Sequence, residues 1–181
     1  MKKIVLSLIL IGCLFSLGAI LPPEYSALPL QQDPEVITGI LDNGLKYYIK
    51  QNAKPEKRIE LRLCIDAGSV DEDDDQRGLA HFVEHMAFNG SKNFPRTEMV
   101  DYLTSIGMGF HNGLNGGTSY NSTVYQFKLP TDDEAKLLKG ISILSDIAWQ
   151  LSFEPSEIER ERGIIQEEWR LGQSAQQRIQ D

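Results

Sequence analysis

Hydrophobic and polar residues alternate in several short segments of this chain. The alternation is cleanest over residues 59–66, which predicts a strand with one buried face. Two shorter segments, 36–41 and 45–50, flank Asp42-Asn43-Gly44, a sequence typical of a hairpin turn. Residues 123–129 alternate in the same way and predict a further strand.

Helical spacing of apolar residues appears in four other segments. They are residues 79–90, 98–106, 131–150 and the stretch that begins at Pro155. The third of these helices is expected to pack through an apolar inner face, made of Leu137, Leu138, Ile141, Leu144 and Ile147. The stripe expected on the last helix consists of Ile158, Ile165 and Trp169. The acidic run 71–75 lacks the glycine and final Glu of an EF-hand loop, and it suits the N-terminus of the helix that follows it.

The N-terminal residues form a targeting signal rather than part of the fold. Two lysines precede an apolar run that Pro22-Pro23 closes, which predicts a signal peptide over 1–21 and a linker over 22–34. Cys13 ends a sequence similar to a bacterial lipoprotein box, so a lipid tether through Cys13 is an alternative, and a retained membrane helix is another. Cys64 is interpreted as a small apolar residue in the core, and a disulfide framework is not expected.

The chain has 181 residues and a formal net charge of −8, which argues against a nucleic-acid partner. Its length is enough for one domain with a sizeable core. Charge and length thus leave an enzyme or a protein-binding module open.

The chemistry of the chain is concentrated in His81-Phe82-Val83-Glu84-His85. On a helix, the two histidines and the glutamate fall within an arc of about 100°, on a face that the core does not claim. Imidazoles four residues apart can both reach one zinc ion, which leaves Glu84 to act on a water bound to that ion. The order H-x-x-E-H is the inverse of the commoner zinc signature. The alternative is a helix with two surface histidines, although the chain has only three histidines in all.

A zinc site needs a further protein ligand, and the last helix offers carboxylates. Glu161 and Glu168 are seven residues apart and share one helical face, whereas Glu167 points to the opposite side. Glu168 is therefore the better third ligand, and Glu161 is placed to orient a ligand from behind. The alternative is that residues 154–168 form a solvated charged helix.

The chain resembles the pitrilysin-like (M16) family of inverzincin zinc metallopeptidases, and in particular its long secreted bacterial members. The motifs that carry the resemblance are, in chain order, Asn43-Gly44-Leu45, Asp66-Ala67-Gly68-Ser69, the segment from Gly78 to Gly90, Leu114-Asn115, Thr118-Ser119, Glu159 to Gly163 and Glu167 to Arg170. The resemblance implies an α+β fold, the LuxS/MPP-like metallohydrolase fold, with a mostly antiparallel sheet covered by helices. Residues 35–181 would be the N-terminal peptidase domain, incomplete on its C-terminal side.

The same resemblance implies a zinc-dependent endopeptidase that hydrolyses peptides or small unfolded proteins in the periplasm. One Zn²⁺ would be held by His81, His85 and Glu168, with Glu84 as general base and Glu161 behind the ligands. Substrate would add as a strand along a sheet edge that includes Asn115. A second homologous half, in the same longer chain or in a partner chain, would complete the enzyme.

Some residues depart from the family pattern. Gly116-Gly117 stands where members often carry a small apolar residue and an aromatic one, which weakens the expected edge strand. His111, in the same altered stretch, is interpreted as a loop residue rather than a ligand. Two other functions stay open: a non-catalytic binding or assembly subunit, and an S-ribosylhomocysteine lyase, which shares the metal helix but uses a cysteine near its site.

Overall fold

The computed structural model describes residues 31–110 and 112–172. The chain divides into two compact units, with the boundary after Asn52. The expected signal peptide, Cys13, His111 and most of the linker lie outside the described residues. Among the described residues, no helix has both the length and the apolar character needed to cross a membrane.

The first unit contains a two-stranded hairpin. Strand β1 (Val36–Ile40) pairs antiparallel with β2 (Lys46–Lys50), and Val36 lies opposite Lys50. The turn uses a positive φ of 87° at Gly44, a conformation that glycine adopts without steric cost. The hairpin predicted around Asp42-Asn43-Gly44 is therefore confirmed.

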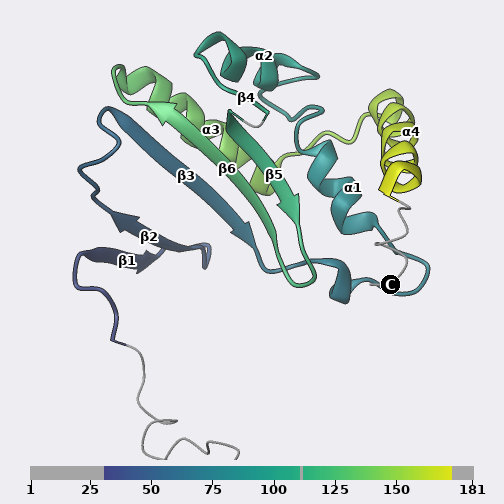
Figure 1. Ribbon diagram of the computed structural model, residues 1–181, viewed down its shortest axis with the longest axis horizontal. Coiled ribbons are helices and arrows are strands. Elements are labelled where there is room, and N and C mark those ends of the chain that lie inside the picture. The colour runs from purple at the N-terminus through teal and green to yellow at the C-terminus, as the bar shows by residue number, and fades with distance from the viewer. Residues whose placement is uncertain (1–30, 111, 173–181) are drawn as a thin grey trace, which may run out of the picture. The chain divides into compact units, whose positions relative to one another are not determined.

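The second unit is a four-stranded sheet with helices on it (Figure 1). The strand order is β3-β6-β5-β4, made of β3 (Arg58–Ile65), β6 (Thr123–Pro130), β5 (Gly113–Thr118) and the short β4 (Gly109–Phe110). The pairs β3–β6 and β6–β5 are antiparallel, and β4 runs parallel to β5. A short 3₁₀ turn, η1 (Ser69–Asp71), and the helices α1 (Leu79–Met86) and α2 (Glu98–Ser105) lie between β3 and β4 in the sequence. The helices α3 (Glu134–Trp149) and α4 (Pro155–Gly172) follow β6. The α+β fold with a mostly antiparallel sheet is as expected.

The core lies between the sheet and its helices. Alternate residues of β6 are buried completely, namely Tyr125, Phe127 and Leu129, and they belong to one cluster with apolar residues of α2, of α3 and of the segment directly after α1. Ile59, Leu61, Leu63 and Ile65 of β3 pack against this cluster, as their alternation predicts.

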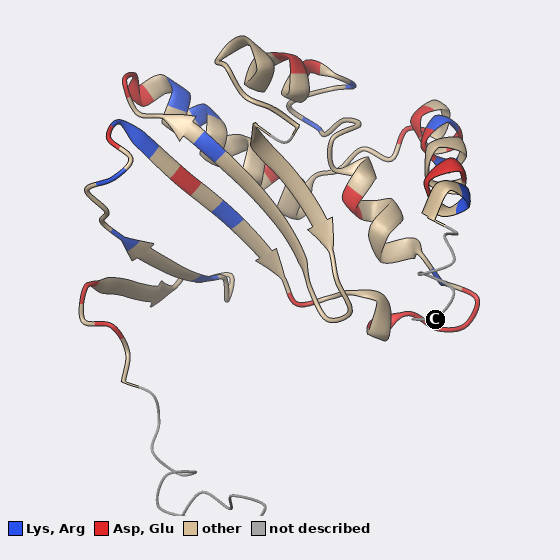
Figure 2. Ribbon diagram, in the orientation of Figure 1, with Lys and Arg blue, Asp and Glu red and all other residues tan. Residues whose placement is uncertain are grey.

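Cys64 is exposed, so its expected place in the core is wrong. It lies on the face of β3 that also carries Glu60 and Arg62, because successive side chains of a strand point to opposite faces. Figure 2 shows the charged residues along this strand.

The inner face expected for α3 is also wrong in part. Leu138 and Ile141 are exposed, and the buried positions are Gly140, Ile143, Asp146 and Ile147. A Cβ at Gly140 would lie 2.1 Å from Cδ1 of Leu129, so the bare backbone permits a close approach between α3 and β6. The packing face thus runs through a glycine and an aspartate, which a count of apolar residues passes over.

Two carboxylates position the helix that carries the histidines. Glu72 accepts hydrogen bonds from the backbone N–H groups of Gly78 and Ala80, both at 2.7 Å, at the start of α1. Asp146 of α3 accepts bonds from the hydroxyl of Ser91 at 2.6 Å and from Asn93 at 2.8 and 2.9 Å. These bonds secure the start of α1 and the segment that follows it, so the helix is held at both ends.

Candidate metal centre

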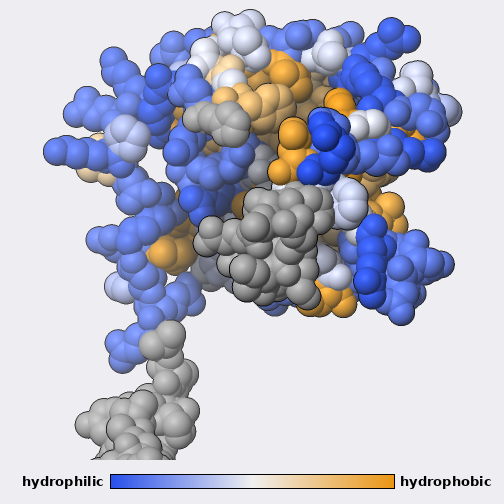
Figure 3. All heavy atoms as spheres, turned by 45° about the vertical axis from the view of Figure 1, so that its right-hand side comes forward, coloured by the Kyte–Doolittle hydropathy of each residue, from blue (hydrophilic) through white to orange (hydrophobic). Residues whose placement is uncertain are grey.

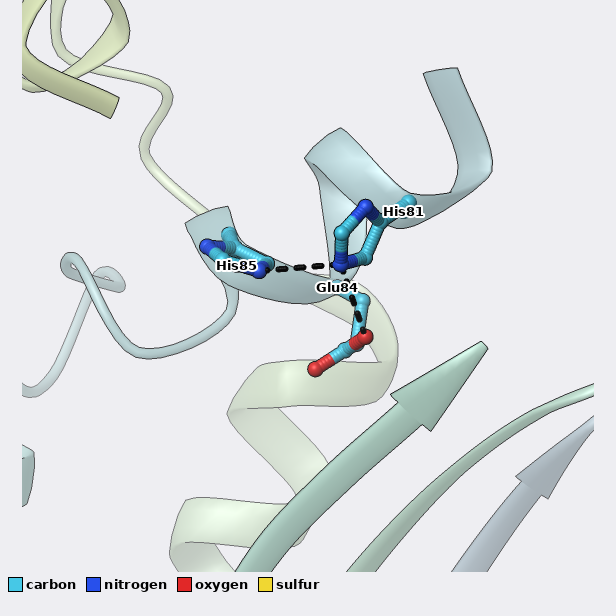
Figure 4. Close-up of side chains that lie close together, drawn as sticks. All are labelled: His81, Glu84 and His85. Carbon is cyan, nitrogen blue, oxygen red and sulfur yellow. Dashed lines mark hydrogen bonds and ion pairs between the residues drawn. The ribbon is translucent and has the colours of Figure 1, made fainter. Parts of the chain in front are cut away.

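Helix α1 presents His81, Glu84 and His85 together (Figure 4). Atom Nε2 of His81 lies 3.0 Å from Nε2 of His85, and the two rings meet edge to face. An oxygen of Glu84 lies 4.0 Å from Nε2 of His81, and one ligand atom from each residue fits within 4.8 Å of the others. The helical spacing therefore brings the three side chains to one point, as the sequence predicts.

The sequence predicts Glu84 on a helix face that the core does not claim, but the Glu84 side chain is buried. Its exposed fraction is 8%. The hydroxyl of Thr118 donates to Oε2 of Glu84 over 3.2 Å, and a Cβ at Gly116 would lie 2.5 Å from Oε1. The glycine thus leaves room for the carboxylate beside β5. Burial, together with the charge of Glu84, raises the pKa of the Tyr125 phenol well above its usual value, so this hydroxyl stays protonated.

Helix α4 brings two carboxylates to the histidines. Oε2 of Glu168 lies 3.5 Å from Nε2 of His85 and 3.8 Å from Nε2 of His81. Oε1 of Glu161 lies 2.7 Å from Nδ1 of His85. Glu167 pairs with Arg170 rather than with either histidine, and this pairing holds the pKa of the Glu167 carboxyl below its usual value.

Other expectations for α4 are only partly met. Glu161 is 5% exposed, so the interpretation of this segment as wholly solvated is wrong at that residue. Trp169 is 69% exposed and does not extend the buried stripe of the helix. Figure 3 turns the side of α4 towards the viewer and shows hydrophobic residues exposed among hydrophilic ones.

The donor atoms fit a small divalent cation. Around a tetrahedral zinc with bonds of about 2.1 Å, neighbouring ligand atoms lie about 3.4 Å apart. The separations among the two Nε2 atoms and Oε2 of Glu168 are 3.0, 3.5 and 3.8 Å. The carboxylate of Glu161 accepts a hydrogen bond from Nδ1–H of His85, which leaves the Nε2 lone pair of that ring available to a metal. Three carboxylates around two imidazoles also supply the negative charge that a dication needs.

Two residues behind the histidines were not identified from the sequence. The side-chain amide of Asn89 donates to the carbonyl of His85 and to Oε2 of Glu161, at 3.0 and 2.9 Å. Arg160 donates to the amide oxygen of Asn89. Their position beside the motif residues was a signal, but only the packing of α4 against α1 brings them together.

A cavity of about 740 Å³ opens in front of these residues. Its wall includes the metal-site residues and one side of β5, among them Asn115, Gly116, Gly117 and Thr118. Only Gly113 and Leu114 of β5 pair with β4. Within the described residues, the edge of β5 from Asn115 to Thr118 is therefore free for an extended segment to pair with. Apolar side chains of Phe88, Val100, Phe110 and Ile164 line other parts of the wall.

The inverted His-Glu-His motif, carried on a helix beside a mostly antiparallel sheet, is typical of the inverzincin class of zinc peptidases. Residues 47–181 match the family described as Insulinase (Peptidase family M16), and the chain belongs to that family.

Named relatives agree with this assignment. The chain is 38% identical over 179 residues to the probable zinc protease PqqL of Haemophilus influenzae. This alignment covers 99% of this chain and 19% of the relative. The crystal structure of the periplasmic protease PqqL from Escherichia coli matches with 43% identity and a TM-score of 0.80, over 84% of this chain and 17% of that one. The ferredoxin protease FusC, solved in complex with Arabidopsis ferredoxin, matches at 33% identity and a TM-score of 0.72, over 80% of this chain and 16% of that one.

The chain spans less than a fifth of the length of these relatives. It covers 32% of the separately solved first half of E. coli PqqL, also at a TM-score of 0.80. The expected likeness to the N-terminal part of a long bacterial member is therefore confirmed.

Proposed function

We propose that this chain carries the metal centre of a zinc-dependent metalloendopeptidase that hydrolyses peptides or small unfolded proteins. The observation that carries the proposal is the convergence of Nε2 of His81, Nε2 of His85 and Oε2 of Glu168 on one point. These three atoms would hold one Zn²⁺. Zinc bound there would acidify a coordinated water and polarise the carbonyl of the scissile bond.

Glu84 is the general base of this proposal. Its carboxylate lies beside the ligand atoms without being needed as a ligand, and the hydroxyl of Thr118 fixes its orientation. It takes a proton from the attacking water and passes it to the leaving amine. Glu161 keeps the His85 ring oriented through Nδ1.

The substrate is proposed to bind as a strand on the free edge of β5. Asn115 lies on this edge and in the cavity wall, which supports its role in holding the peptide backbone. The glycines at 116 and 117 leave the strand without side chains next to Glu84, so selectivity would come from the apolar residues of the opposite wall.

The setting proposed for the chain is the periplasm, with a second homologous half beside it. The E. coli relative is described as a periplasmic protease, and the signal sequence expected over 1–21 agrees with export. That relative is also described by its first half, which supports a partner half for this one. A lipid tether through Cys13 remains a sequence-based hypothesis.

The proposal is tested by peptide cleavage with the Glu84→Gln variant. The substitution keeps the shape of the side chain but removes the base. We expect zinc content to stay at the wild-type level while kcat falls by at least about 100-fold, a usual contribution of general-base catalysis. Cleavage is measured for the chain alone and after addition of a second-half chain. Wild-type turnover by Glu84→Gln would show that the assigned role is wrong.

A non-catalytic binding or assembly subunit is the second candidate function. Peptide binding without any zinc-dependent cleavage, with or without a second half, would favour it. The lyase alternative is not supported, because Cys64 lies outside the residues that line the cavity and the family match is to peptidases.

A further inference from the structure

Asn89 is a buried amide whose hydrogen-bonding atoms are all used. Its Nδ2 donates to the main-chain carbonyl of His85 at 3.0 Å and to Oε2 of Glu161 at 2.9 Å. Its Oδ1 accepts from the guanidinium of Arg160. Because an arginine can only donate and a carboxylate can only accept, these partners fix which way the amide points.

The contacts of Asn89 close a ring of hydrogen bonds around His85. One oxygen of Glu161 binds Nδ1 of the imidazole, and the other oxygen binds the amide of Asn89. The same amide returns to the main chain of His85. The Glu161 carboxylate is therefore held at both oxygens, so it cannot rotate without breaking a bond. The orientation of the His85 ring, and with it the direction of Nε2, follows from that restraint.

We propose that Asn89 is a positioning residue of the metal centre, which acts through Glu161 to aim Nε2 of His85 at the metal position. The inference rests on the proposed function. Arg160, which directly precedes Glu161 on α4, completes the arrangement by donating to the amide oxygen of Asn89. Asn89 is not a ligand, since the atom that could coordinate a metal, its amide oxygen, accepts from Arg160 instead.

A purely structural role gives a different expectation. The carbonyl of His85 lies in the last turn of α1, where it accepts from the backbone N–H of Phe88 at 3.1 Å, and the bond from Asn89 adds a second donor that also caps this end. A cap stabilises the helix whether or not Glu161 is present. A positioning residue has its effect only when Glu161 is present.

A double-mutant cycle on the full chain separates these roles. Zinc dissociation constants are measured by competition with a chromophoric chelator for wild type, Asn89→Ala, Glu161→Ala and the double variant. We expect Asn89→Ala to weaken zinc binding by about tenfold, as loss of a partner behind a ligand does. In the Glu161→Ala background the same change should alter the constant by less than about twofold, because coupled residues are not additive.

The matched control is Asn93→Ala. Asn93 lies in the same segment after α1, and its amide donates to Asp146 at 2.8 Å rather than to the metal site. We expect this variant to lower Tm while zinc affinity stays within about twofold of wild type, because the Ser91 hydroxyl and the backbone N–H of residue 93 still bind Asp146. Asn89→Asp is the second variant: it keeps the size and the acceptor for Arg160, but it removes both donors and places a like charge beside Glu161. It should weaken zinc binding at least as much as Asn89→Ala.

The outcomes are distinguishable. An Asn89→Ala constant within twofold of wild type, or an equal loss in both backgrounds, would overturn the positioning role and leave only the cap. A wild-type chain that binds no zinc would instead overturn the proposed function itself.

Discussion

At the scale of single residues, the side chains of the site differ widely in solvent exposure. The His81 side chain is 42% exposed and that of Glu84 is 10% exposed, although they are three positions apart on one helix. The buried carboxylate depends on what surrounds it, namely a hydroxyl from Thr118 and the bare backbone of Gly116. The strand β5 therefore positions the carboxylate that is proposed to act as the general base.

Thr118 gives a prediction at this scale. Thr118→Val removes the hydroxyl that donates to Glu84 while keeping the shape of the side chain. We expect kcat for peptide cleavage to fall about tenfold, equivalent to about 1.4 kcal/mol, with zinc affinity unchanged, because the hydroxyl touches the base and not a ligand. Thr118→Ser, which keeps the donor, should retain most of the activity. A Thr118→Val enzyme as fast as wild type would show that the base needs no such partner.

The histidines and Glu84 could be predicted from the sequence because they depend on the period of a single helix. Glu168 was favoured over Glu167 by the same periodicity, and the structure brings Glu168 rather than Glu167 to the histidines. Asn89 and Thr118 could not be assigned in this way, because their contacts come from the packing of α4 on α1 and of β5 beside α1. Sequence spacing does not reveal such long-range pairs.

At the scale of elements, the metal helix is held in place by buried charge as well as by apolar packing. Asp146 is 2% exposed and ties the segment after α1 to α3. Burial alone would raise the pKa of Asp146, but the hydrogen bonds from Ser91 and Asn93 outweigh it and leave the pKa below its usual value. The inner face of α3 was misjudged from the sequence for this reason: its buried positions include an ionised residue and a glycine.

Asp146→Asn tests this anchor. A lowered pKa in the folded state means that the stabilisation is present above the unfolded value of about 3.9 and is lost as the pH falls through the folded value. We expect the variant to lose about 2 kcal/mol at pH 7 and its Tm to drop by about 5 °C. Its Tm should then fall less than that of wild type between about pH 5 and pH 3. Calorimetry across that range measures both effects.

Asp132→Asn is the control for this experiment. Asp132 pairs with Lys136 near the start of α3, where its side chain is 56% exposed, and such surface pairs contribute little to stability. The Tm of the Asp132→Asn variant at pH 7 should stay close to that of wild type. Equal Tm values and equal acid sensitivity for Asp146→Asn and wild type would contradict the anchoring role of Asp146.

At the scale of the whole molecule, the proposed centre connects segments that are far apart in the sequence. Two ligands come from α1 and the third from the far end of α4, so one cation would link the two helices. Binding energy gained only in the folded arrangement stabilises that arrangement, and zinc should therefore raise Tm. The chain also spans under a fifth of its named relatives, which is why its zinc binding is a more direct test than its turnover.

The central claim is that His81, His85 and Glu168 hold one zinc ion, and zinc content after dialysis against a weak chelator tests it most directly. The comparison is between Glu168→Gln and Glu167→Gln, since these carboxylates are neighbours on α4 and Glu167 pairs with Arg170 instead. We predict one zinc per chain for wild type and for Glu167→Gln, and close to none for Glu168→Gln. Full zinc content in Glu168→Gln, or none in wild type, would contradict the account.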